Sequence, residues 1–207
     1  MEQALDILSR EPATARHISL QLATYFVGDQ PAPALVDAMA KTFEHTDGDI
    51  AAVLKTLFDS REFDASLDGA FKDPVHYAVS AVRLAYDQQP ILDAEPVQTW
   101  LNRMAEGLYD HETPDGYPMT SAAWNGPGQM TARFEVARQI GSGAPGLFRT
   151  DGQAPGVRPA PAQLQAALSH SGLQRSLDPR TLGALGQTAT PTDWNALFLS
   201  SPEFMRR

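Results

Sequence analysis

Apolar residues recur three and four positions apart along most of this chain, and no stretch shows sustained alternation of apolar and polar residues. The first spacing places apolar side chains on one face of an α-helix, whereas alternation would be needed for a half-buried β-strand. We therefore predict an all-α fold. It should be an irregular bundle of orthogonal and antiparallel helices, with a long structured loop and an arm rich in proline and glycine.

Capping residues and prolines indicate where the helices begin. Three expected helices start with an N-cap residue followed by proline, namely at Asp73-Pro74, Asp178-Pro179 and Thr190-Pro191. The sequence Gly126-Pro127-Gly128 should delay the helix that follows it until about Gln129. The main helices are expected over residues 14–27, 33–45, 50–58, 74–89, 93–107, 129–140, 161–169, 179–185 and 191–199.

One short pattern occurs twice. Residues 57–63 and 198–204 both place Ser, one further residue, Glu and Phe after an apolar helix end. This order suits a serine that caps a short helical turn and an aromatic side chain that returns to the core. We interpret the repeat as a reused way of ending a helix, with an internal duplication as the alternative.

The domain organisation follows from a change in composition. Residues 1–140 should form the main helical bundle, including a structured loop at 108–128. Residues 141–160, rich in proline and glycine, are expected to be an exposed connection. Residues 161–207 should form short helices that pack back on the bundle, which gives a single domain overall.

The composition limits the possible partners. The 207 residues, 43% of them hydrophobic, suffice for one full core. A formal net charge of −9 with only 16 scattered Lys and Arg disfavours nucleic acid and anionic membranes, because binding to either depends on basic residues. Cysteine is absent, which excludes disulfides and thiolate chemistry. No transmembrane segment and no signal peptide is expected within this chain.

The loop at 108–128 begins with an acidic turn that contains Asp110, His111, Glu112 and Asp115. These residue types could bind a divalent cation, because hard cations prefer carboxylate oxygens. Their spacing is unspecific, however, and the same residues around Pro-Asp-Gly are typical of a solvated tight turn. We favour the turn and expect no other cofactor.

Tyr117, Trp124 and Arg133 are the candidate binding residues. The two aromatic faces could stack on a carbohydrate or a peptide, or could instead plug the loop onto the helices. Arg133 lies in a helix beside apolar residues, where an arginine needs carboxylate or carbonyl partners. We predict that Arg133 clamps the loop through Asp115 or Glu112, with binding of an anionic ligand as the alternative.

The common catalytic and ion-binding motifs are missing from the sequence. It has no Gly-x-Ser-x-Gly elbow, no pair of histidines at zinc-helix spacing and no glycine-rich phosphate loop after a strand. The turn at residues 46–49 lacks the twelve-residue ligand pattern of a calcium loop, so we interpret it as a helix cap. Sequence motifs therefore assign no reaction.

Several small motifs nevertheless occur in a recognisable order. Residues 11–63 contain Pro-Ala-Thr-Ala, Asp-x-Pro-x-Pro, Asp-Gly-Asp and Ser-x-Glu-Phe, and further elements follow at 72–75, 107–108, 114–118, Trp124, Arg133 and 201–207. Together they resemble the C-terminal half of a bacterial family known as domain of unknown function 1800. Tyr117 departs from the family pattern, which usually has tryptophan there.

The resemblance implies that an N-terminal half precedes this chain in typical members, and it favours a periplasmic or secreted location. The first hypothesis is accordingly a helical scaffold or binding module, one half of a larger bacterial envelope or secreted protein. A second hypothesis is an enzyme, such as a metal-assisted hydrolase, whose site needs the missing half. A third is a carbohydrate or peptide binder that uses Tyr117 and Trp124. A separate protein could take the place of the N-terminal half as partner, and the oligomeric state is left open.

Overall fold

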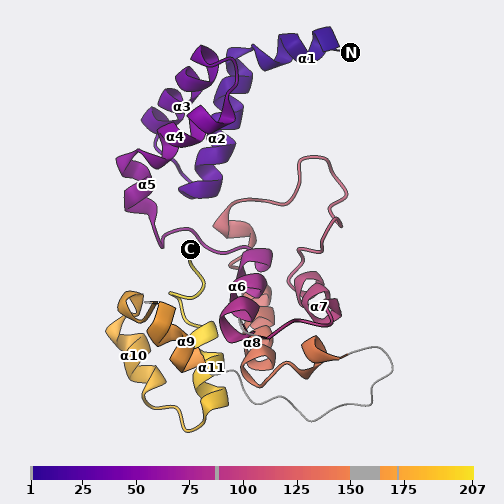
Figure 1. Cartoon of the computed structure of the whole chain (residues 1–207), viewed down its shortest axis with the longest axis vertical. Helices are drawn as coiled ribbons and strands as arrows, with labels where there is room; N and C mark the ends of the chain where they lie inside the picture. Colours follow the sequence, from indigo (N-terminus) through magenta and orange to yellow (C-terminus); the bar gives the residue numbers. More distant parts are fainter. Residues whose placement is uncertain (1, 87–88, 150–163, 172) are drawn as a thin grey trace. The chain divides into compact units, whose positions relative to one another are not determined.

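The computed structural model describes residues 2–86, 89–149, 164–171 and 173–207. Within these ranges the fold is all-α, as predicted, and contains no strand (Figure 1). The chain divides into two compact units, which are described separately. Unit 1 comprises Met1–Phe71, Met119–Ser121 and Arg207, and unit 2 comprises Lys72–Pro118 and Ala122–Arg206.

Unit 1 is built on three packed helices. Helix α2 packs against α3, and α3 packs against α4, around a core that includes Met39, Val53 and Leu57. Ser121, from a later part of the chain, donates its backbone N–H to both carboxylate oxygens of Asp29 at 2.9 and 3.0 Å. The helices of this unit are α1 (Glu2–Ser9), α2 (Pro12–Phe26), α3 (Pro33–His45), α4 (Ile50–Phe58) and α5 (Arg61–Ser66).

Unit 2 is organised around α6 and α8. Helix α11 packs along α8, and α6 contacts α7, α8 and α9. The helices are α6 (Pro74–Tyr86), α7 (Glu95–Arg103), α8 (Pro127–Gly141), α9 (Leu164–Ser171), α10 (Pro179–Leu185) and α11 (Pro191–Leu199). The chain also has short 3-10 turns, namely η1 (Ser121–Ala123), whose first residue belongs to unit 1, and η2 (Pro145–Phe148) and η3 (Leu173–Ser176) in unit 2. Leu147 in η2 is fully buried, while residues 150–163 of the expected connection and of the helix after it lie outside the described residues.

Predicted caps account for the start of several helices. Asp49 accepts hydrogen bonds from the backbone N–H groups of Ala51 and Ala52, which confirms the turn at 46–49 as a helix cap. Asp178 and Thr190 cap α10 and α11 as predicted. The repeated pattern also behaves as expected, because Ser60 Oγ accepts from the N–H of Phe63 and Ser201 Oγ accepts from the N–H of Phe204.

Several helix bounds differ from the prediction, and two of the differences have a clear physical reason. Helix α8 begins at Pro127, not Gln129, because a proline in the first helical position lacks only an N–H that would have no partner there anyway. Helix α7 was expected to reach Gly107 but ends at Arg103. Ala105, at φ 61°, has left the helical region, so the chain enters a tight turn four residues early.

Candidate functional site

The polar centre of unit 2 is Arg133, which projects from α8 and is fully buried. Its guanidinium donates to the backbone carbonyl of Lys72 at 2.7 Å and contacts the sulfur of Met205 at 3.7 Å. It also lies over the ring of Tyr77, 4.9 Å from the centroid, where the aromatic face favours a cation. Burial lowers the pKa of Arg133 to about 10, so the side chain is still charged at neutral pH.

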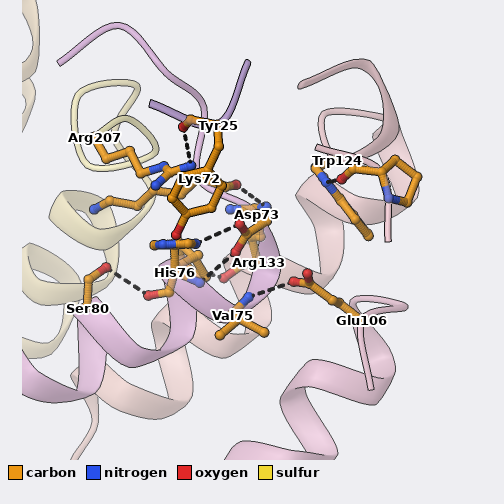
Figure 2. A network of polar contacts seen from close by, with 12 residues as sticks. Tyr25, Lys72, Asp73, Val75, His76, Ser80, Glu106, Trp124, Arg133 and Arg207 are labelled. Carbon is orange, nitrogen blue, oxygen red and sulfur yellow. Dashed lines mark hydrogen bonds and ion pairs between the residues drawn. The ribbon is translucent and has the colours of Figure 1, made fainter. Parts of the chain in front are cut away.

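Helix α6 begins beside this arginine, and two carboxylates lie at its first turn (Figure 2). Asp73 accepts from the backbone N–H of His76 at 2.7 Å through one oxygen and pairs with His76 Nδ1 at 2.6 Å through the other. Glu106 accepts from the N–H of Val75 at 2.9 Å. Both acids thus bind N–H groups that the helix itself leaves without partners.

The carboxylates also interact electrostatically with the arginine. Burial raises the pKa of Glu106, with the negative charge of Asp73 adding to the rise, while its bond to Val75 and the charges of His76 and Arg133 act against it. The charges of Asp73 and Glu106 in turn oppose the loss of charge on Arg133. Asp73, Glu106 and Arg133 therefore form one charge cluster at the start of α6.

This placement corrects the predicted clamp. We expected Asp115 or Glu112 to pair with Arg133, but both of these are exposed whereas Arg133 is fully buried. The carboxylates that act on Arg133 come from the start of α6 and the turn after α7 instead. Sequence proximity pointed to the wrong acids, because the actual partners lie 27 to 72 positions away from Arg133 in either direction.

Lys72 completes the cluster from the residue before Asp73. Its ammonium group donates to the carbonyl of Phe204 at 2.7 Å and lies 3.9 Å from the centroid of the Phe204 ring. Tyr77, also buried, donates its hydroxyl to the carbonyls of Arg133 at 3.1 Å and Leu199 at 3.2 Å. The polar groups here are used to join backbone segments of α6, α8 and the C-terminal region.

The aromatic candidates of the loop are directed inward. Trp124 is 4% exposed and donates its indole N–H to the carbonyl of Pro118 at 2.8 Å. Tyr117 is partly exposed, and its hydroxyl donates to the carbonyl of Gly107 at 3.0 Å. The two rings lie 6.2 Å apart. These contacts tie the loop to itself, and both interpretations of the two aromatic residues stay predictions.

The acidic turn is exposed and bonded internally. Thr113 donates its hydroxyl to Asp115, and that bond holds the pKa of Asp115 below its ordinary value. The His111 ring contacts the Tyr117 ring edge-on, with centroids 4.6 Å apart. Within the described ranges, no three acidic or histidine side chains, Asp110 and Glu112 included, are grouped so that they could hold a metal ion.

The turn at 105–110 is the part of the site that sequence reasoning missed. Tyr109 is 106% exposed at φ 60°, and Ala105 is at φ 61°, so two non-glycine residues occupy the left-handed region within five positions. Leu108 beside it is 53% exposed. The sequence did offer a signal: a Leu-Tyr pair stands directly after a glycine and before several acidic residues. No helical or strand pattern accounts for that apolar pair.

Comparison with known families gives the relationship of the chain. The sequence model of the family described as Protein of unknown function (DUF1800) matches residues 1–206. The chain belongs to the DUF1800 family. Its membership confirms the resemblance inferred from the scattered motifs, and the family description assigns no activity to this member. Comparisons with curated proteins and with solved structures gave no match.

In the ranges that the structure describes, no helix of this family member combines the length and the apolar character needed to cross a bilayer.

Proposed function

We propose that this chain is a non-catalytic helical binding module, the scaffold half of a larger bacterial envelope or secreted protein. Its role is to hold the turn at 105–110 in a fixed shape and to present Leu108 and Tyr109 to a partner. The observation that carries the proposal is the complete exposure of Tyr109 in the left-handed region of backbone conformation.

An exposed aromatic in this conformation is costly in two ways. Left-handed backbone costs a non-glycine residue about 1 kcal/mol or more, and the ring gains nothing from burial within the chain. Strained backbone of this kind persists only where the surrounding structure fixes it, and it gathers at functional positions. Both costs are offset if a partner buries the Tyr109 ring on binding.

The surroundings of the turn fix it from several sides. Tyr117 bonds the carbonyl of Gly107, and Glu106 bonds the N–H of Val75. A Cβ on Gly107 would lie 2.5 Å from Asn102 Oδ1 and 2.9 Å from the Cβ of Asp110, so a larger residue would force its neighbours to shift. A turn held in this way presents its side chains at little further entropic cost on binding.

Direct binding of a carbohydrate or peptide by Tyr117 and Trp124 receives less support. Stacking needs an accessible ring face, and Trp124 is 4% exposed. In the present proposal both residues act by holding the loop that carries Leu108 and Tyr109.

One observation favours an enzyme as the second candidate. Both oxygens of Asp73 are bonded to His76, which orients the imidazole, and the side chain of His76 is 35% exposed. A histidine oriented by a carboxylate can act as a general base in hydrolysis. The test is hydrolysis of a panel of nitrophenyl esters, phosphates and glycosides by the chain and by its His76→Ala variant. Equal rates for the two proteins would rule this candidate out.

Site-specific photo-crosslinking tests the binding proposal. Tyr109 is replaced by a photo-reactive benzoylphenylalanine in the organism that produces the protein, and crosslinked species are identified by mass spectrometry. Leu182, which is 41% exposed on α10, serves as the matched control position. We expect one dominant protein adduct at position 109 that is absent at position 182. Equal crosslinking at both positions would refute the proposal.

A further inference from the structure

The chain between Arg103 and Arg133 has an unusual charge distribution. It contains Glu106, Asp110, Glu112 and Asp115 but no lysine or arginine, although the whole protein has 16 basic residues. The side chains of Asp110, Glu112 and Asp115 are exposed. All the charged side chains of the segment that carries Leu108 and Tyr109 are thus acidic, with His111 set aside.

The exposed apolar and acidic residues are neighbours in the sequence. Leu108 and Tyr109 are 53% and 106% exposed, and Asp110 and Glu112 follow them within three positions. Tyrosine is enriched among the residues that dominate binding energy, because it buries a large rigid ring and loses only two torsions. Leucine adds aliphatic area but no hydrogen bond, so the pair suits an apolar pocket better than a sugar ring.

We infer that the partner is a protein with an apolar pocket for Leu108 and Tyr109 and a rim of Lys and Arg facing Asp110 and Glu112. This inference rests on the proposed binding role of the turn. Exposed carboxylates around an apolar contact are repelled by nucleic acid and by anionic lipid, and they attract a basic protein surface. Opposite charges at the rim of the contact mainly accelerate association. Leu108 and Tyr109, once buried in the pocket of the partner, slow dissociation.

The test uses the 207-residue chain and the protein that crosslinks at position 109, purified after its identification. Association and dissociation rates are measured over ionic strengths from about 0.05 to 0.5 M, a range across which salt screening becomes strong. The charge variant combines Asp110→Asn with Glu112→Gln. Its matched control combines Glu44→Gln with Glu62→Gln, two exposed carboxylates of unit 1.

We expect the charge variant to associate about tenfold more slowly at low salt and to lose most of the salt dependence, with the control unchanged. Tyr109→Ala should weaken the complex by about thirtyfold or more, chiefly through faster dissociation. If the charge variant keeps the association rate and salt dependence of the natural chain, the basic rim is wrong while the binding role of the turn stands.

The remaining outcomes separate the two proposals further. Unchanged affinity in Tyr109→Ala would overturn the binding role itself, together with the inference built on it. Adducts at position 109 that contain only a second copy of this chain, or only lipid, would leave the turn as a contact but overturn the inference of a basic protein partner.

Discussion

At the scale of single residues, the structure of unit 2 depends on the charged guanidinium of Arg133, which is fully buried. Arg133 donates a hydrogen bond to the carbonyl of Lys72, lies over the ring of Tyr77 and is attracted electrostatically by Asp73 and Glu106. Removal of one member of a buried charge cluster leaves the others uncompensated in a medium of low dielectric. In this structure Arg133 is a core residue with no exposure to solvent, and we propose that its role is structural.

We predict that Arg133→Ala destabilises the protein by about 3–5 kcal/mol in urea denaturation, because the variant keeps Asp73 and Glu106 without their buried cation. Arg138→Ala, an exposed position on the same helix, is the control and should change stability by less than about 0.5 kcal/mol. A loss in Arg133→Ala as small as that of the control would show that the buried charge contributes little.

Glu106 gives stability a specific dependence on pH. Its pKa is raised in the folded chain, so the folded state binds a proton more tightly than the unfolded state. The contribution of Glu106 to stability therefore falls as pH rises from its ordinary pKa of 4.5 to the raised value, and is constant above it. Glu106→Gln can still accept the bond from Val75 but does not titrate.

As pH increases through this window, the free energy of unfolding of the natural chain should therefore fall relative to that of Glu106→Gln. Urea denaturation of both proteins from about pH 4 to pH 7 measures that difference. A difference that stays constant with pH would be inconsistent with a raised pKa.

Ser19 is a buried polar residue of a different kind. Its side chain in α2 is 0% exposed, and its hydroxyl has no hydrogen-bond partner among the described residues. Ser19→Ala should stabilise the protein by about 1 kcal/mol, since it removes an unsatisfied group and raises helix propensity. Ser80→Ala, whose hydroxyl bonds the carbonyl of Tyr77, should give no comparable gain. A loss of stability in Ser19→Ala would reveal a partner for the hydroxyl.

At the scale of elements, the sequence predicted the helices well where capping residues, proline or glycine mark both helix ends. Proline in the first position and a capping side chain fixed α10 and α11, and residues 33–45 were predicted with the observed bounds. The turn after α7 could not be predicted, because Ala105 and Tyr109 have no intrinsic preference for positive φ. The hydrogen bonds beside it join Gly107 to Tyr117 and Glu106 to Val75, which are 10 and 31 positions apart, so no local helix or strand pattern encodes them.

The cap of α4 offers a test at this scale. Asp49 accepts from two backbone N–H groups at 2.9 and 3.3 Å, so Asp49→Ala should cost about 1 kcal/mol of stability. Asp49→Asn keeps an accepting oxygen and should recover most of that loss. Thermal or urea denaturation of the three proteins measures the difference, and equal losses in both variants would show that the cap is not the cause.

At the scale of the whole molecule, the all-α class and the DUF1800 family were within reach of the sequence, whereas the site was not. Helical periodicity is a local property, and the family pattern consists of short motifs in a fixed order. The partners of Arg133 and the display of Tyr109 arise only after folding. Function in this chain is therefore proposed from the turn that the fold exposes, not from a motif that the sequence contains.

The crosslinking yield at position 109, compared between the natural background and a Gly107→Ala background, tests that proposal most directly. A Cβ at residue 107 would lie too close to the side chains of Asn102 and Asp110, and we expect the turn to shift to relieve this, while Leu108 and Tyr109 are left chemically unchanged. We predict a strong single protein adduct in the natural background and a yield reduced about tenfold or more in Gly107→Ala, in line with the cost of misplacing a central contact. Equal yields in the two backgrounds would contradict a turn that binds through its fixed shape.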